Sequence, residues 1–168
     1  FTLGGVTYAN IPGSSIRLQT SPGVMADLVM FQIYPTPPNA PVEIRQTSPV
    51  VYSYTILIGN GYQQGAPTSF DPYGPALEPP LLDGWTWTGP KKVRWGINQV
   101  HDYPNLVILG TQTFRTQFDD NFLEAHATTG DSGGAAFIYE TSSVPELAGI
   151  MLAVTAEWQQ PYGTCLLT

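Results

Sequence analysis

Proline and glycine are spread along the whole chain, and they limit what it can fold into. Among 168 residues there are 16 prolines and 17 glycines, and both residue types interrupt regular helices. The runs between them are short and rich in Val, Ile, Thr, Tyr and Phe, which favour strands. The expected strands are Val6–Ala9, Ser15–Gln19, Leu28–Tyr34, Val50–Gly59, Lys92–Val100, Leu106–Phe114, Ala135–Tyr139, Leu147–Val154 and Thr164–Leu167. The sequence therefore predicts an all-β protein, a barrel or a sandwich.

Three segments between the expected strands have other compositions. Pro35–Pro49 contains a cluster of prolines and is predicted to be an extended linker. Gln63–Asp83 is also rich in Pro and Gly, so we expect a long exposed loop that could line a cleft. Asn121–His126 is the one place where a short helix of a turn or two is expected.

Charge and cysteine content exclude several classes of protein. The formal net charge is −7 and only 11% of the residues are charged, so the chain lacks the basic surface that binds nucleic acid. A single cysteine, Cys165, excludes an internal disulfide and matches no metal-binding motif. No apolar run approaches the length of a membrane span. We expect no metal, no cofactor and no nucleic-acid partner.

The stretch from Gly130 to Gly134, which reads Gly-Asp-Ser-Gly-Gly, is the strongest candidate for chemistry. Such a stretch occurs in ordinary turns, and it also occurs at catalytic nucleophiles. The α/β-hydrolase arrangement needs an acid and then a histidine after the serine, but no Asp or His follows Ser132. The chymotrypsin arrangement places both before the serine. There the N–H groups of Gly130 and Ser132 can converge to form an oxyanion hole, while Asp131 anchors the loop.

Further segments match one family, in the order in which that family has them. They are Met25–Ile33, Ile56–Gly65, Arg94–Asn98, Phe114–Ser132, Glu146–Val154 and Tyr162–Thr168. With these segments the sequence resembles the trypsin/chymotrypsin-like serine proteases, in particular the secreted bacterial type without disulfides. The resemblance implies an all-β, chymotrypsin-like double β-barrel whose first barrel is incomplete. Residues 1–49 would be the C-terminal part of the first barrel plus the linker, and residues 50–168 the second barrel with the nucleophile.

The resemblance also implies roles for individual residues. Asp27 would orient the catalytic histidine, Ser132 would be the nucleophile, and Gly130 with Ser132 would form the oxyanion hole. The side chains that contact the substrate would be His126, Thr129, Leu152 and Val154. Asn60 stands where the family usually has Trp, and Val154 stands where it has glycine. A valine there would narrow the pocket and disfavour a large or basic substrate side chain.

The chain contains two histidines, and neither is expected to be the base of Ser132. His101 lies at a predicted strand end and is interpreted as a surface residue. His126 is too close to Ser132 along the chain to turn back on it, and it is either a pocket residue or an exposed loop residue. In chymotrypsin the histidine precedes the aspartate by about 45 residues, which puts the base roughly 20 residues before Phe1. We therefore expect residues 1–168 to be an N-terminally truncated piece that is inactive by itself.

The function expected from these observations is that of a serine endopeptidase. It would hydrolyse a peptide or protein substrate through an acyl-enzyme, as a secreted, periplasmic or cell-envelope bacterial protein. A trypsin-like module that binds without catalysis is the alternative, and a histidine upstream of Phe1 would distinguish the two. A third class is an all-β adhesion module in which the Gly-Asp-Ser-Gly-Gly stretch occurs by chance. The sequence does not indicate an oligomeric state.

Overall fold

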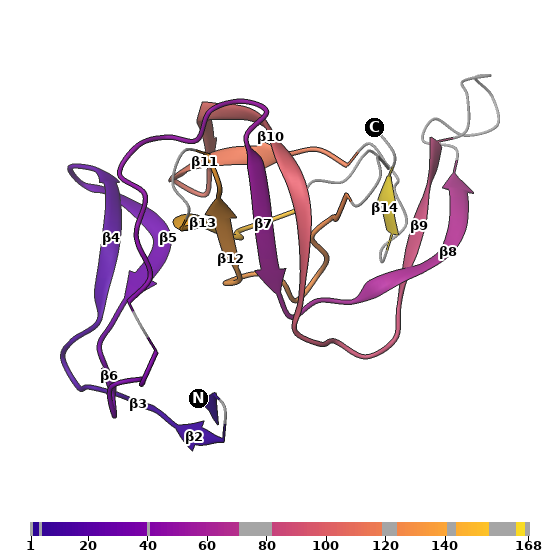
Figure 1. Cartoon of the computed structure of the whole chain (residues 1–168). Coiled ribbons are helices and arrows are strands. Elements are labelled where there is room, and N and C mark those ends of the chain that lie inside the picture. Colours follow the sequence, from indigo (N-terminus) through magenta and orange to yellow (C-terminus); the bar gives the residue numbers. More distant parts are fainter. Residues whose placement is uncertain are drawn as a thin grey trace. The chain divides into compact units, whose positions relative to one another are not determined.

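The computed structural model describes residues 2–3, 5–39, 41–70, 82–118, 124–140, 144–154 and 164–166. Throughout these residues the chain forms strands, turns and bends, without a helix (Figure 1), so the prediction of an all-β protein is confirmed. The described residues accordingly contain no helix long and apolar enough to cross a membrane. The short helix expected at 121–126 is wrong for residues 124–126, because Glu124 forms a parallel bridge with Ile97. Residues 121–123 lie outside the described part.

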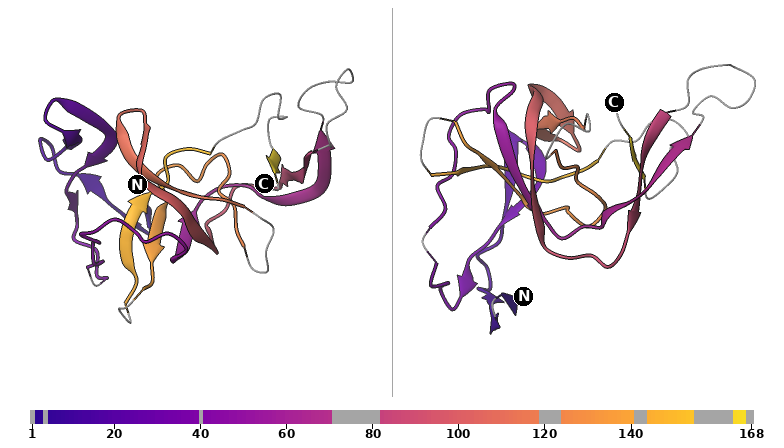
Figure 2. Two further views of the ribbon diagram at one scale, coloured as in Figure 1. Left: turned by 90° about the horizontal axis from the view of Figure 1, so that it is seen from above. Right: turned by 45° about the vertical axis from the view of Figure 1, so that its right-hand side comes forward.

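The described residues form fourteen strands. These are β1 (Thr2–Leu3), β2 (Val6–Thr7), β3 (Ala9–Asn10), β4 (Ile16–Ser21), β5 (Val24–Met30), β6 (Ile33–Tyr34), β7 (Tyr54–Gly59), β8 (Gln63–Phe70), β9 (Leu82–Thr88), β10 (Arg94–Ile108), β11 (Thr111–Thr116), β12 (Ala135–Ile138), β13 (Glu146–Ile150) and β14 (Thr164–Leu166). The largest sheet has the order β11-β10-β7-β12-β13 and curls into a half-barrel (Figures 1 and 2). This half-barrel does not establish a chymotrypsin-like double barrel, which stays a prediction.

The chain divides into two compact units. The first comprises Phe1–Val42 together with Pro104–Phe114, and the second comprises Glu43–Tyr103 together with Arg115–Thr168. The boundary after Val42 falls within the proline-rich segment that the sequence marks as a linker. The return of Pro104–Phe114 to the first unit was not indicated by the sequence, because it occurs within a continuous strand, β10.

The strand register of the half-barrel brings three distant parts of the sequence to one edge of the sheet. Gly59 at the end of β7 pairs with Arg94 at the start of β10. Ala135 at the start of β12 pairs with Ile58 on one side and with Ile150 at the end of β13 on the other. The core lies between these strands, with the buried side chains Thr55, Leu57, Asn98, Val100, Ala136 and Ile138. The segment before β12, which contains Ser132, therefore lies beside the end of β7 and the start of β10.

A hairpin replaces most of the loop expected at Gln63–Asp83. β8 and β9 pair antiparallel from Gln63 opposite Thr88 to Phe70 opposite Leu82, and β14 pairs with the other side of β9. Figure 2 shows β8 and β9 side by side along their length. The prediction failed because β8 contains Gly65 and Pro67, which are tolerated on an edge strand with a register shift. Residues 71–81 lie outside the described part.

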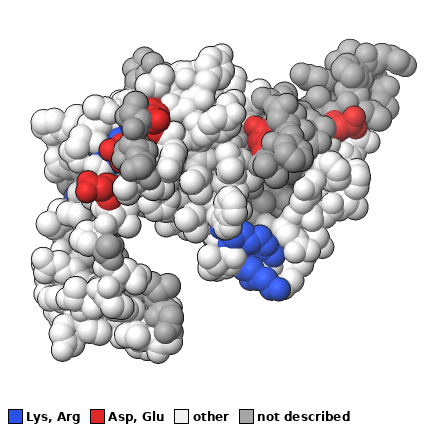
Figure 3. All heavy atoms as spheres, viewed as in Figure 1, with Lys and Arg blue, Asp and Glu red and all other residues white. Residues whose placement is uncertain are grey.

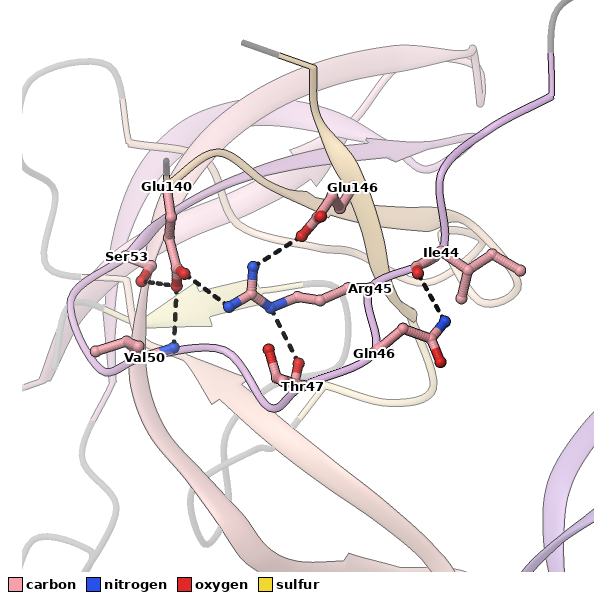
Figure 4. Close-up of polar contacts among 8 residues, drawn as sticks. All are labelled: Ile44, Arg45, Gln46, Thr47, Val50, Ser53, Glu140 and Glu146. Carbon is pink, nitrogen blue, oxygen red and sulfur yellow. Dashed lines mark hydrogen bonds and ion pairs between the residues drawn. The ribbon is translucent and has the colours of Figure 1, made fainter. Parts of the chain in front are cut away.

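The second half of the Pro35–Pro49 segment, predicted to be an extended linker, is tied to the half-barrel by Arg45 (Figure 4). Its guanidinium bonds Glu140 at 2.6 Å and Glu146 at 2.9 Å, and its Nε donates to the carbonyl of Thr47. Glu140 also accepts hydrogen bonds from the Ser53 hydroxyl and the Val50 N–H. The Ser53 hydroxyl, followed by the Val50 N–H and Arg45, holds the pKa of Glu140 below its usual value. We call this arrangement of Arg45, Glu140 and Glu146 the Arg45 clamp.

The first unit contains the β4–β5 hairpin, which is held to the β10–β11 turn. Thr20 donates to the carbonyl of Gly110 at 2.6 Å, and the N–H of Asp27 donates to the Thr111 hydroxyl at 2.7 Å. Ala26, next to Asp27 on β5, is buried. Several large apolar side chains of this hairpin region are exposed, namely Ile16, Val24, Met25, Val29, Met30 and Phe31. The hairpin thus presents an apolar surface within its own unit.

Candidate active site

The Gly130–Gly134 segment is a tight turn that leads directly into β12. The N–H of Asp131 bonds the carbonyl of Thr128, and the N–H of Gly134 bonds the carbonyl of Asp131. Gly130 has a φ of +107° and Gly133 a φ of +82°, in the region of backbone space that favours glycine. Ser132 is exposed at the centre of the turn. Two glycines therefore allow the backbone to present a serine to solvent.

The two N–H groups expected to form an oxyanion hole are not consumed by other contacts. Among the described residues, no hydrogen bond uses the N–H of Gly130 or of Ser132. The neighbouring groups are paired, since the N–H of Gly133 bonds the carbonyl of Met151 and the N–H of Met151 bonds the carbonyl of Gly134. These bonds hold the C-terminal half of the turn against the end of β13. Among the described residues of the turn, the N–H groups of Gly130 and Ser132 thus remain available to bind a substrate oxygen.

Thr128 fixes the Asp131 side chain from within the protein. The N–H of Thr128 donates to Asp131 Oδ2 at 2.7 Å, and the Thr128 hydroxyl lies 3.1 Å from the same oxygen. The hydroxyl also accepts the N–H of Tyr62 at 2.8 Å. Thr128 is buried, so these bonds are protected from competition with water. The Asp131 side chain therefore anchors the turn through hydrogen bonds.

The two glycines that follow β7 are needed for the same contact. A Cβ at Gly59 would collide with the Asp131 carboxylate, and a Cβ at Gly61 would collide with both that carboxylate and the Thr128 hydroxyl. Neither glycine has a positive φ, so their role is close approach rather than an unusual backbone. The Ile56–Gly65 segment and the Gly130–Gly134 segment therefore fit together as one structural unit.

The Arg94–Asn98 segment supports the turn from the other side. Arg94, Gly96 and Asn98 occupy alternate positions along β10, so all three positions lie on the same face of the strand. Arg94 donates to the carbonyl of Gly61 at 3.0 Å, and the Asn98 side chain donates to the carbonyl of Ala125 at 2.9 Å. A Cβ at Gly96 would collide with the Ala125 side chain. This strand therefore positions both the end of β7 and the segment that carries His126 and Thr128.

A pocket of about 230 Å³ opens beside this arrangement, entirely within the second unit. It is lined by aromatic, glycine and polar residues from β7 to Met151: Leu57, Gly59, Gly61, Tyr62, Gln63, Gln64, Trp87, Arg94, Trp95, Gly96, Phe118, Glu124, Ala125, His126, Ala127, Thr128, Asp131 and Met151. Of the four residues expected to contact substrate, His126 lines it, whereas Thr129, Leu152 and Val154 are not among its lining residues. Val154 is 36% exposed.

His126 is held in an apolar setting at this pocket. Its ring meets Phe118 edge-on, with the ring centroids 5.7 Å apart. Burial lowers the pKa of His126 below its usual value of 6.5, and the Ala127 backbone and the charges of Asp131 and Glu124 oppose this more weakly. The imidazole is therefore kept neutral at physiological pH. His126 lines this pocket and is half-buried, and its role in contacting substrate stays a prediction.

Asp27 and Ser132 belong to different units. Asp27 is exposed within β5 rather than at its start, and its backbone N–H bonds Thr111. His101 is exposed and lies within β10, not at a strand end. The roles of Asp27, His101 and the substrate-contacting residues stay predictions.

Sequence reasoning missed Thr128 and the close-approach roles of Gly59, Gly61 and Gly96. A threonine three residues before an aspartate is not a known sequence motif, so nothing in the sequence marked Thr128 as an anchor of the turn. The three glycines lie inside the Ile56–Gly65 and Arg94–Asn98 segments that the sequence analysis singled out, but a glycine in a sequence does not show which side chain it leaves room for. The described residues also contain no group of three or more His, Cys, Asp or Glu side chains placed to hold a metal ion.

Neither protein-family models, nor curated proteins, nor solved structures give a match to this chain. The likeness to the trypsin/chymotrypsin-like proteases thus depends on the residues named above and on the geometry of the turn.

Proposed function

We propose that this chain carries the nucleophile of a serine endopeptidase. The observation behind the proposal is the Ser132 turn. It has an exposed serine and two N–H donors without a partner among the described residues, on a backbone held by Thr128, Asp131 and two close-approach glycines. An ordinary surface turn has no need of a buried anchor that reaches back to β7. Such anchoring is what a preorganised oxyanion site requires.

In the proposed reaction the Ser132 hydroxyl attacks the carbonyl carbon of a peptide bond. Its proton passes to a histidine supplied from outside residues 1–168, and Asp27 orients that histidine. The negative charge that develops on the carbonyl oxygen is stabilised by the N–H groups of Gly130 and Ser132. The amine leaves with the transferred proton, and water then hydrolyses the acyl-enzyme.

The neutral His126 and the apolar pocket bear on the preference of the proposed enzyme. The pocket contains Tyr62, Trp87, Trp95 and Phe118, which offer apolar area, and of its two carboxylates, Glu124 and Asp131, the second is hydrogen-bonded by Thr128. We propose that small apolar side chains suit the substrate site better than large or basic ones. This preference is a consequence of the proposed function and is tested with it.

The test compares the parent protein with its Ser132→Ala variant. The parent, extended upstream to include the proposed histidine, should cleave peptides and react with a fluorophosphonate, which forms a phosphorus–oxygen bond with the serine and releases fluoride. Ser132→Ala should lose on the order of 10⁶-fold in kcat, as removal of a triad serine does. Ser69→Ala, at an exposed serine on β8, is the matched control and should retain activity.

Equal cleavage by the parent and by Ser132→Ala would refute the serine mechanism. If neither cleaves while both bind peptides, the non-catalytic binding module is the better description. Cleavage mainly after Lys or Arg would leave the mechanism intact and refute the proposed preference.

A further inference from the structure

Cationic side chains are few in this chain, and most of the described ones are engaged in structural contacts. Arg45 forms the clamp with Glu140 and Glu146, Arg94 donates to Gly61 and Gln63, and Arg17 donates to Ala26. Lys91 and Lys92, in the turn between β9 and β10, are exposed. Figure 3 shows cationic side chains gathered at that end of β10, apart from the acidic ones on the same face.

Lys91 lies directly against the Ser132 turn. Its Cδ, Cε and Nζ atoms are each 2.9 Å from the position that a Cβ on Gly130 would take. Its Nζ also lies over the ring of Tyr62, 5.1 Å from the centroid, in the range of a cation–π contact. The ammonium therefore lies beside the backbone that carries the serine.

The backbone that carries Lys91 is itself anchored to the active-site scaffold. The N–H of Lys92 bonds the carbonyl of Gly61 at 3.2 Å, and Arg94 reaches both that carbonyl and the carbonyl of Lys92. Gly61 is the residue packed against Asp131 and Thr128. One set of contacts thus fixes both the serine turn and the lysine beside it.

We propose that Lys91 is a subsite for a carboxylate of the substrate, so that the preferred peptides carry Asp or Glu within a few residues of the scissile bond. The inference rests on the proposed function in taking Ser132 as the nucleophile. A chain of net charge −7 repels acidic peptides on average, and a cation beside the reacting turn gives such peptides one favourable orientation.

Lys92 provides a matched control for this inference. It is adjacent, exposed and equally charged, but its side chain makes no ring contact or hydrogen bond among the described residues. Lys91→Met removes the ammonium while keeping most of the apolar stem, and Lys91→Arg keeps a cation. Lys92→Met changes the net charge by the same amount as Lys91→Met, so it separates a local subsite from general electrostatics.

The experiment measures kcat/KM of the parent protein on paired peptides in which Glu replaces Gln at one position at a time, three residues to either side of the cleaved bond. One position should show a preference for Glu of about three- to fivefold, the size that an exposed ion pair supports. Lys91→Met should abolish the preference, whereas Lys91→Arg and Lys92→Met should retain it. The preference should shrink as salt is raised.

Three outcomes would overturn the subsite. These are cleavage without any Glu preference, equal loss of the preference in Lys91→Met and Lys92→Met, and a Lys91→Met defect of the same size on Glu and Gln peptides. Each leaves the proposed peptidase intact.

A second readout covers the case in which no peptide is cleaved, which would count against the proposed function. Binding of fluorescently labelled Glu and Gln peptides to the Ser132→Ala protein is then followed by anisotropy. A Glu preference that disappears in the Ser132→Ala, Lys91→Met double variant supports the subsite, and equal binding of both peptides overturns it.

Discussion

At the scale of single residues, the candidate site depends on a few small side chains. Thr128 supplies two donors to one carboxylate oxygen of Asp131 while its hydroxyl receives the N–H of Tyr62. Valine would fill the same space and keep the backbone N–H bond to Asp131, but it would leave the N–H of Tyr62 without its acceptor, and an unpaired buried group costs more than the bond contributes when formed. Glycine is needed at 59 and 61 because Asp131 occupies the space of a side chain.

His126 gives a prediction about pH. Because burial lowers its pKa in the folded state, the unfolded chain takes up a proton below about pH 6.5 while the folded chain does not. The neutral, buried imidazole is therefore compatible with the folded state above pH 6.5. As the pH falls from 6.5 toward the lowered pKa, proton uptake favours the unfolded chain and the free energy of unfolding decreases. The free energy of unfolding, measured by urea titration, should therefore decrease between pH 7.5 and pH 5.5.

The second histidine is the control for this prediction. His126→Asn should remove most of the decrease, and His101→Asn, at an exposed position, should leave it unchanged. A wild-type curve that is flat over this range, or one flattened by His101→Asn, would contradict the assignment to His126.

At the scale of elements, strand register decides which motifs meet. The end of β7, the start of β10 and the start of β12 share an edge of the half-barrel, so the connections at that edge contact one another. The Arg45 clamp acts on a different element, the segment before β7. Its backbone also pairs with β13, through the N–H of Arg45 to the carbonyl of Leu147 and the N–H of Leu147 to the carbonyl of Glu43.

Removing the clamp should destabilise the protein. The Arg45 side chain is only 9% exposed, and Arg45→Met would leave Glu140 and Glu146 facing each other without their cation. We expect a loss of about 1–3 kcal/mol in the free energy of unfolding, the cost of unpaired and partly buried polar groups. Arg17→Met, at an exposed arginine with one hydrogen bond to Ala26, should cost about 0.5 kcal/mol or less. Equal effects of the two substitutions in urea unfolding would show that the clamp contributes little.

At the scale of the whole molecule, the chain consists of two compact units, and the proposed triad draws on both. Ser132 and its supports belong to the second unit, whereas Asp27 belongs to the first. The proposed base belongs to neither, because the family resemblance places it upstream of Phe1. The proposed mechanism therefore assigns roles to residues beyond those of the second unit.

This organisation predicts that residues 1–168 alone hydrolyse peptides feebly. A serine hydroxyl without an adjacent base is a weak nucleophile, although an oxyanion hole and substrate binding can leave a rate about 10³–10⁴-fold above water. The parent with its upstream histidine should exceed the isolated chain by several orders of magnitude in kcat. Comparable turnover by the two proteins, measured on one peptide substrate, would show that the base lies within residues 1–168.

Local features of the sequence were sufficient for the all-β class and for the serine turn. Scattered proline and glycine exclude long helices wherever they occur, and the positive φ of Gly130 and Gly133 follows from the ease with which glycine adopts it. The short helix expected at 121–126 is wrong for residues 124–126, and the loop expected at 63–83 is wrong for residues 63–70 and 82–83, for a common reason. In both places pairing with a distant strand, Ile97 with Glu124 and β9 with β8, outweighed local preference.

The sequence by itself determined the strand-rich class, the acidic charge and the presence of a glycine-flanked serine, because each depends on composition or on neighbouring residues. Only the tertiary structure decided what surrounds that serine. Thr128 meets the Tyr62 backbone across 66 residues, and Lys91 meets Gly130 through a turn that belongs to another pair of strands. Such contacts are set by sheet register and by the space that glycines leave open, and neither can be predicted from the residues that are neighbours in the sequence.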